Sequence, residues 1–408
     1  MHILPMSFAL FTYTGCWRPV YWSANSIKYW MYNVYASFMF TLLQSFAVYG
    51  LVDTFLSHSL QEFLDKLYLF LSIFGVSIKL LHLFIRRRRI IGLGEMLLKK
   101  NCIPRDANEE SIQEKFDRNA RDFCDMDMEK EIFVILTFHQ CTWVTIACEV
   151  LNEFCTFMAT FAQFYPLLKT RTLPVYKWAP FDLSSLAAFL PILIYQSVAL
   201  CLCANCSVAH ETLIAGMMIQ VCAQYEILCH RAHILPALLM EAEKKSVSEQ
   251  DLRARERLII RDLIQHHLYV YKLAYTVNAV FTLMMFAQFS LSLLVLCMSV
   301  YRISNMESLL TFRFAHIFSY LASMLMQLFL YCWYGNEVML KSVEVCNAVY
   351  EMDWTRLRVR VMKDLAIIMM RASKPFKMSS GYLVTLTNDS FTSILKVSYS
   401  AYNFLKGS

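Results

Sequence analysis

Glu149 and Glu153 lie one helical turn apart and form the arrangement in this sequence closest to an acid–base pair. Such a pair also needs a nucleophile, a metal or a third orienting group, and the sequence supplies none. Both carboxylates fall in an apolar stretch, at a depth that Arg313 shares in a later stretch. An ion pair with that arginine would lower the cost of burial. The sequence therefore predicts no catalytic residue and no enzyme.

Cysteines offer a second kind of chemistry, because the chain has 14 of them. The densest cluster, Cys201, Cys203 and Cys206, lacks the second pair or histidine partners that zinc sites use. Most of the cysteines lie within apolar stretches, where a free cysteine behaves as a small hydrophobic side chain. We therefore expect no metal site and no cofactor.

The overall composition indicates the environment in which these glutamates and cysteines are held. Of the 408 residues, 57% are hydrophobic and 17% are charged, whereas soluble domains carry about 25% charged residues. The chain lacks the polar residues needed for a soluble surface. Its net charge of +6 is not gathered with aromatic residues in one polar domain, so nucleic acid is not an expected partner. The expected surroundings are a lipid bilayer.

Seven apolar stretches are long enough to cross a bilayer as helices. The second ends at four consecutive arginines, 86–89, which stop a membrane span. After the fourth, apolar residues recur at helical spacing from 211, so that helix is expected to continue beyond the membrane. Residues 335–380 are too charged to span. The seven expected spans are 29–52, 64–85, 131–157, 183–210, 268–300, 309–334 and 382–406.

The distribution of Lys and Arg predicts the orientation, because cytosolic loops are enriched in both. They concentrate in 1–28, 86–130, 211–267 and 335–380, all on one side of a seven-span chain. The N-terminus is therefore expected in the cytosol and the C-terminus outside. A metabotropic seven-helix receptor has the opposite orientation. A solute transporter remains an alternative, although the internal repeats common in transporters are not visible.

The C-terminal third resembles the insect odorant receptors. The resemblance lies in the run 331–338, which reads YCWYGNEV, in the final stretch 391–400, which reads FTSILKVSYS, and in residues between them. Those residues are Ser342, Ala348, Tyr350, Trp354 and Pro375. The first 330 residues resemble the family only in their layout. Gustatory receptors usually carry a different ending, and the family's shared co-receptor is longer, so the chain is most similar to an odour-tuning subunit.

The resemblance implies an all-α integral membrane protein that forms an odour-gated, non-selective cation channel. The implied assembly is a heteromeric tetramer with the odorant co-receptor in the plasma membrane of sensory neurons. Small volatile molecules are the implied ligands. Three regions are expected: 1–334 with the odour-binding helix bundle, 335–380 as a cytosolic helical anchor, and 381–408 as the pore-lining last helix.

Candidate site residues follow from these regions. The expected ligand-binding residues are apolar, aromatic or weakly polar side chains in the outer halves of the spans: Tyr68, Phe70, Phe74, Cys148, Asn152, Tyr195, His316, Ser319 and Tyr320. Another face of the last helix is the alternative to the stripe that is expected to line the pore, which comprises Phe391, Leu395, Ser398, Tyr402 and Leu405. The expected anchor and interface residues are Trp333, Gly335, Glu337, Tyr350 and Trp354.

Overall fold

A computed structural model of the chain describes residues 4–19, 22, 26–99, 102–105, 108–109, 111–112, 140–160, 173, 175–176, 178, 185–304 and 312–407. Within these ranges, only the backbone is described at 60–61, 64–65, 140–143, 312–313, 401–402 and 404–407.

The described part of the chain is almost entirely helical. Its long helices are α2 (Ile27–Phe55), α3 (Leu60–Leu97), α6 (Gln140–Thr160), α8 (Leu186–Lys245), α9 (Glu249–Ser304), α10 (Phe312–Tyr350) and α12 (Asn388–Gly407). The shorter elements are α1 (Pro5–Tyr13), the 3-10 helix η2 (Trp354–Arg356), α11 (Val359–Ala372), β1 (Ser379–Ser380) and β2 (Val384–Thr385). Each of the seven expected spans overlaps one long helix, and residues 131–139 of the third span lie outside the described residues.

Five of the described helices are long and apolar enough to cross a membrane. They lie at Ile27–Phe55, Lys66–Leu97, Leu186–Lys245, Glu249–Ser304 and Phe314–Tyr350. The fourth expected span continues without interruption to Lys245, as its amphipathic pattern predicts. Apart from one short hairpin, the described fold is all-α, with several helices of membrane-spanning length and composition.

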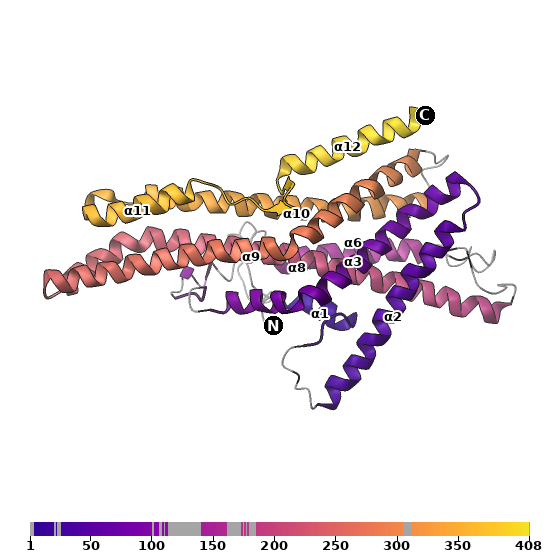
Figure 1. Ribbon diagram of the computed structural model, residues 1–408, viewed down its shortest axis with the longest axis horizontal. Helices are drawn as coiled ribbons and strands as arrows, with labels where there is room; N and C mark the ends of the chain where they lie inside the picture. Colours follow the sequence, from indigo (N-terminus) through magenta and orange to yellow (C-terminus); the bar gives the residue numbers. More distant parts are fainter. Residues whose placement is uncertain are drawn as a thin grey trace, which may run out of the picture.

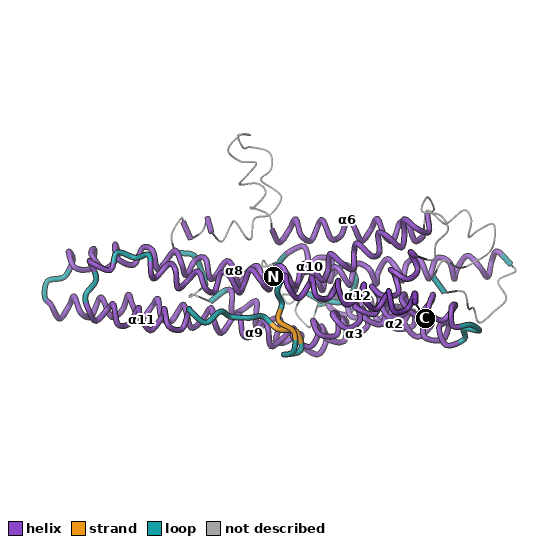
Figure 2. Tube along the Cα trace, turned by 90° about the horizontal axis from the view of Figure 1, so that it is seen from above, coloured by secondary structure: helices purple, strands orange, loops and turns teal. Residues whose placement is uncertain are grey.

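The long helices form an elongated bundle (Figure 1). One end of the bundle is formed by α8, α9, α10 and α11 alone. The other half also contains α2, α3, α6 and α12. In the view from above, α6 lies on one side of the bundle and α2 and α3 on the other (Figure 2). Helix α8 packs against α6, α9 and α10, and α3 packs against α9.

Helix α8 is the centre of the bundle. Every residue from Val208 to Tyr225 is buried. Small residues such as Ala209 and Ala215 occur within this stretch, and small residues allow neighbouring helices to approach closely inside a membrane. Gly216 leaves the space that Leu4, just before α1, occupies. A helix segment that is buried on all sides is stable only when other helices surround it, and that is the position of α8.

The last expected span and the purely helical fold both need one local correction. Helix α12 begins at Asn388 rather than near Tyr382, because residues 379–385 form a small antiparallel hairpin in which Ser379 pairs with Thr385. Gly381 and Tyr382 have φ of 59° and 62° at its turn, a conformation that hairpin turns require. Helix α9 holds the hairpin: Gly381 N donates to the Thr282 carbonyl (2.9 Å) and Ser379 N to Asn278 Oδ1 (2.9 Å).

Charged residues of the anchor region, 335–380, pair with other helices of the same chain. Arg358 lies 3.3 Å from Glu256 and 3.5 Å from Glu249, both on α9. Lys341 on α10 lies 3.3 Å from Glu226 on α8. Exposed pairs of this kind contribute about 0–1 kcal/mol each, so apolar packing must supply most of the stability of this region.

Candidate functional site

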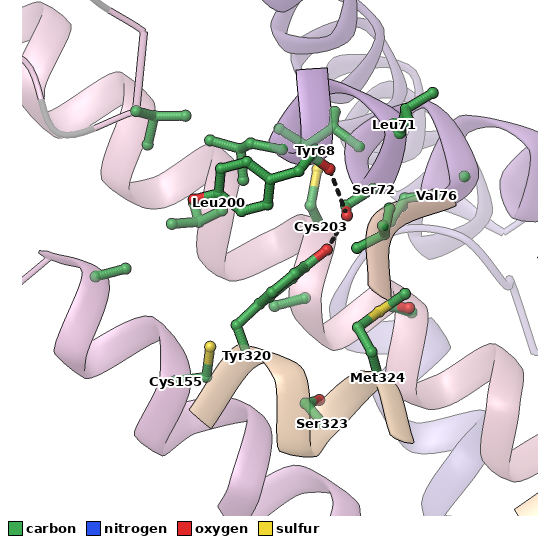
Figure 3. Close-up of a pocket in the computed structure, with 18 of the residues that line it drawn as sticks. Tyr68, Leu71, Ser72, Val76, Cys155, Leu200, Cys203, Tyr320, Ser323 and Met324 are labelled. Carbon is green, nitrogen blue, oxygen red and sulfur yellow. Dashed lines mark hydrogen bonds between the residues drawn. The ribbon is translucent and has the colours of Figure 1, made fainter. Parts of the chain in front are cut away.

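One large cavity lies inside the bundle, between α3, α6, α8, α9 and α10. Its volume is about 740 Å³, within the range of small-molecule sites. Apolar side chains form much of its wall, among them Leu71, Val76, Leu200 and Met324 (Figure 3). The helices around it are distant in sequence, and Leu173, Val175 and Tyr176, between α6 and α8, complete the lining.

Polar groups interrupt this apolar wall at its middle. The hydroxyls of Ser72 on α3 and Tyr320 on α10 are hydrogen-bonded across the cavity (Figure 3). Ser72 also donates to the Tyr68 carbonyl (3.1 Å), and the rings of Tyr68 and Tyr320 meet edge to face at 5.7 Å. Asn152 on α6 lines the same wall, and its Nδ2 is buried with no hydrogen-bond partner among the described residues. The cavity is thus apolar with a few polar groups, as small-molecule sites commonly are.

A buried ion pair forms one end of the cavity, which we call the floor. Lys79 Nζ on α3 lies 2.6 Å from Glu211 Oε1 and 2.7 Å from Ser207 Oγ, both on α8. The lysine is 3% and the glutamate 1% exposed. Next to this pair, His82 contacts His210 (3.3 Å between ring nitrogens) and the Val280 carbonyl (3.0 Å). Charges inside a membrane protein are costly unless paired, and the floor satisfies that condition.

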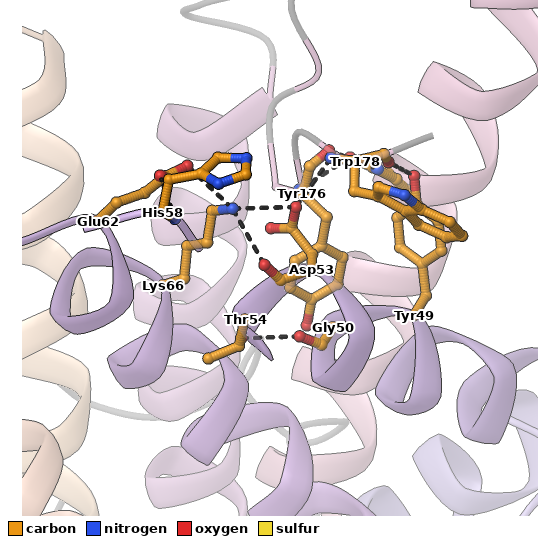
Figure 4. Close-up of polar contacts among 10 residues, drawn as sticks. Tyr49, Gly50, Asp53, Thr54, His58, Glu62, Lys66, Tyr176 and Trp178 are labelled. Atoms are coloured by element: carbon orange, nitrogen blue, oxygen red, sulfur yellow. Dashed lines mark hydrogen bonds and ion pairs between the residues drawn. The ribbon is translucent and has the colours of Figure 1, made fainter. Parts of the chain in front are cut away.

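The opposite end, which we call the mouth, carries a second polar network (Figure 4). Lys66 Nζ, on the cavity wall, lies 3.2 Å from Asp53 Oδ1 and 3.1 Å from Glu62 Oε1. The same Asp53 oxygen accepts from Trp178 N (2.8 Å). Burial raises the pKa of the Tyr176 phenol, which therefore stays neutral beside this network. These contacts hold the segment around Tyr176 and Trp178 against α2.

Asp53→Ala is expected to loosen this segment. The change removes the acceptor for Trp178 N and the carboxylate partner of Lys66, which keeps Glu62 and the backbone carbonyl of residue 53 (3.0 Å), at a cost of about 1–3 kcal/mol in folding free energy. Hydrogen exchange of the Trp178 backbone amide, which loses its acceptor, should become faster. Asp251→Ala, which removes an exposed pair with Arg255, is the matched control and should leave this exchange unchanged. Equal exchange in both variants would contradict the assigned role of Asp53.

Four of the nine expected ligand-binding residues line the cavity: Tyr68, Asn152, His316 and Tyr320. The other five lie outside its lining: Phe70, Phe74, Cys148, Tyr195 and Ser319. Phe74 is 43% exposed and stacks on Phe70, while Cys148 packs in the main core. Tyr195 shares a hydrogen bond with Ser45 (2.7 Å), and the Ser319 hydroxyl donates to the His316 carbonyl (2.9 Å). Ligand contact by the four lining residues stays a prediction.

Sequence reasoning missed the floor. Lys79 is visible in the sequence as a lysine within an apolar stretch, which is itself a signal of function or pairing. Its partner Glu211 lies 132 residues away, at the point where the fourth apolar stretch becomes amphipathic. Gln288 and Gln327, which also line the cavity, carry no local signal, since single polar residues are common in long membrane helices.

The last helix presents two faces. Phe391 contacts the Phe329 ring of α10 at 5.7 Å, and the Ser398 carbonyl accepts from Cys297 Sγ of α9 (3.8 Å). Ser398 is buried, whereas Leu395 is 37% exposed. The expected pore stripe therefore turns two of its residues toward the chain's own helices. The side chains of Tyr402 and Leu405 lie outside the described residues.

Some of the expected anchor residues are exposed, whereas others are covered by the same chain. Tyr350 is 71% and Trp333 42% exposed, and Glu337 is partly exposed. Trp354 Nε1 donates to the Tyr350 carbonyl (2.9 Å). Gly335, by contrast, is covered by Leu386 of the same chain. The absence of a side chain at Gly335 allows close packing within the chain, and an interface role is not needed to explain this glycine.

The sequence matches one protein family along most of its length. The family model of the 7tm odorant receptors matches residues 59–399. The chain belongs to the odorant receptor family. Because members of this family are membrane proteins and the fold contains long apolar helices, the chain is a multi-pass protein of the plasma membrane.

Individual odorant receptors show more distant similarity. Odorant receptor 10 of Aedes albopictus is 25% identical over 167 residues, which cover 41% of this chain and 44% of that receptor. Odorant receptor 67a of Drosophila melanogaster is 25% identical over 236 residues, or 58% and 55% of the two chains. The chain thus spans about half the length of the curated relatives it matches.

The fold of a solved odorant receptor extends over the whole chain. The olfactory receptor OR5 from Machilis hrabei, solved in complex with eugenol, superposes with a TM-score of 0.79 at 17% identity. The match covers 99% of this chain and 97% of the other. At this identity the likeness establishes the shared fold, and the activity must be argued from the residues themselves.

Proposed function

We propose that this odorant receptor is a subunit of an odour-gated, non-selective cation channel. In this proposal a small volatile molecule binds in the cavity, α12 lines a central pore, and the subunit assembles with the odorant co-receptor as a tetramer. The seven-span topology with a cytosolic N-terminus belongs to the same proposal.

The observation that carries the proposal is a continuous polar stripe on the uncovered face of α12. Asp389 and residues four, seven, eleven and fourteen positions later lie on one face of the helix. All five are polar and exposed: Asp389, Ser393, Lys396, Ser400 and Asn403. A polar stripe facing lipid would be costly, whereas a stripe facing a water-filled pore is stable. This face, rather than the stripe through Ser398, is therefore the proposed pore lining.

Helix α9 offers a path from cavity to pore. Its residues Leu291 and Val295 line the cavity, and Cys297, half a turn further on, contacts α12 through the Ser398 carbonyl. A ligand that displaces α9 would therefore act directly on the helix that lines the pore. A ligand shifts a conformational equilibrium only when it binds one state more tightly, so we expect the cavity to differ between closed and open channels.

Exposed apolar side chains in the anchor region support assembly with a partner subunit. Tyr350, Val359, Ile367 and Met370 are 71%, 67%, 60% and 64% exposed. They lie at the end of the molecule formed only by α8, α9, α10 and α11 (Figure 1). Apolar residues clustered at an end that extends beyond the other helices are typical of a protein interface.

Whole-cell recording of cells expressing the chain, with and without the co-receptor, tests the proposal. An inward cation current during an odour panel, present only with both chains, is the expected result. Current from this chain alone would remove the co-receptor from the proposal. Saturating solute flux without single-channel currents would instead establish a transporter, and a response that depends on G proteins would establish a metabotropic receptor.

Lys396→Glu is expected to change ion selectivity. The substitution replaces a positive ring position of the proposed pore with a negative one, and charged rings set selectivity between cations and anions. When the bath salt is diluted, the reversal potential should shift toward the equilibrium potential of the permeant cations. Lys377→Glu, the same charge change on an exposed residue before the hairpin, should leave the reversal potential unchanged. Equal behaviour of the two variants would place Lys396 outside the pore.

A further inference from the structure

The cavity is long, as the spacing of the residues along its wall shows. On α3 the lining includes Lys66 and Lys79, 13 residues apart, or about 20 Å along a helix axis. On α9 it includes Gln288 and Arg302, which corresponds to roughly 21 Å. The two helices run in opposite directions, so the floor is formed by Lys79 and Gln288 and the mouth by Lys66 and Arg302.

The floor presents hydrogen-bonding groups that the protein leaves unused. Gln288 Nε2 donates to Gln327 Oε1 (3.0 Å) and to Ser292 Oγ (3.0 Å). These bonds leave Gln327 Nε2 as a donor and Gln288 Oε1 as an acceptor, and neither has a partner among the described residues. Both side chains line the cavity, and Gln288 is 4% and Gln327 8% exposed. Neither atom is among the fully buried unpaired atoms, so both are accessible from the cavity, and a bound ligand that supplies their hydrogen-bond partner gains affinity.

At the mouth, the charged side chains already have protein partners, unlike the unused amide groups at the floor. Its Lys66 is already paired with both Asp53 and Glu62, and the Arg302 guanidinium stacks over the Tyr68 ring at 4.2 Å. Aliphatic side chains form much of the wall between the two ends: Leu69, Ile73, Val76, Leu291, Val295 and Met324. Polar groups interrupt it at the middle, where the Ser72 and Tyr320 hydroxyls bond to each other and Asn152 lines the wall. The cavity therefore combines a long, largely apolar passage with a floor whose donor and acceptor lack partners in the described part of the chain.

We infer that the ligands of this receptor are elongated aliphatic primary alcohols, bound with the hydroxyl at the floor. The inference rests on the proposed function, in which this cavity is the odour site. One hydroxyl oxygen accepts from Gln327 Nε2 while its O–H donates to Gln288 Oε1, so a single group satisfies both amides. An aldehyde or ester oxygen satisfies only the donor, and an alkane satisfies neither. The aliphatic chain fills the passage toward the mouth.

Competition binding on the purified full chain in lipid nanodiscs tests the inference directly. In this assay, unlabelled dodecanol, dodecanal, dodecane and hexanol each compete with tritiated dodecanol for the cavity. We expect dodecanol to compete best, and dodecane and hexanol to be weaker by about tenfold or more, since each tenfold step corresponds to the loss of about one good interaction. Equal competition by dodecanol and dodecane would overturn the inference, as would stronger binding of hexanol.

Substitutions of the two floor glutamines test where the hydroxyl of the alcohol binds. Gln327→Leu and Gln288→Leu are each expected to weaken dodecanol binding about tenfold while leaving dodecane unchanged. Gln44→Leu, at a glutamine of α2 outside the cavity lining, is the matched control and also corrects for partitioning into lipid. Thermal unfolding without ligand verifies that each variant is folded. If neither floor variant differs from the control, the hydroxyl does not bind at the floor. Binding as expected without any odour-evoked current would retain this inference and overturn the proposed channel.

Discussion

Lys79→Met should sharply reduce the yield of folded receptor. The substitution leaves the Glu211 carboxylate, 1% exposed, with the Ser207 hydroxyl as its hydrogen-bond donor (2.7 Å). Removing one partner of a buried ion pair costs about 3–5 kcal/mol, because the remaining charge is uncompensated. Such a loss is a large part of the stability of a typical protein. The measurement is thermal unfolding followed by size-exclusion chromatography of the receptor in detergent, together with the fraction delivered to the cell surface.

Two variants make this result interpretable. Lys79→Met combined with Glu211→Gln removes both charges and should recover most of the lost stability, since an uncharged pair of similar size is often tolerated. Lys245→Met breaks an exposed pair with Glu241 and should cost about 0–1 kcal/mol. If Lys79→Met unfolds no earlier than Lys245→Met, the ion pair at the floor does not stabilise the bundle.

Gly335→Ala should uncouple odour binding from the current. A Cβ at this position of α10 would collide with the Leu386 side chain and lie 2.9 Å from its carbonyl oxygen. Leu386 belongs to the short segment between the hairpin and α12, so the added methyl group pushes the start of α12 away from α10. Overpacking of this kind costs about 1–3 kcal/mol. We expect a lower unfolding temperature and loss of most of the odour-evoked current at unchanged ligand affinity.

Gly92→Ala is the control for this variant. Gly92 also lies within a long helix, but nothing lies within 4 Å of the position a Cβ would take. Alanine there should stabilise the helix by about 0.5–1 kcal/mol and leave the current intact. A Gly335→Ala receptor with wild-type current and stability would show that the contact with Leu386 does not position α12.

The sequence by itself determined the class of the protein and the places of its long helices. Span length and hydropathy are local properties, so each of the seven apolar stretches overlaps a helix. The resemblance to odorant receptors was likewise visible in short runs such as 331–338, and the family model matches residues 59–399. The hairpin before α12 was missed, since its strands are only two residues long and α9 holds them through Asn278 and Thr282.

Only the tertiary structure decided which face of each helix meets the cavity. On α3 it selected Tyr68 and Ser72 for the wall and left Phe74 exposed. On α12 it turned Ser398 toward α9 and left Lys396 uncovered. In a soluble protein the polar face of a helix reveals its outside, but in a membrane the lipid and the protein interior are both apolar. Hydrophobic periodicity therefore does not distinguish them, and the floor between Lys79 and Glu211 emerges only when α3 packs against α8.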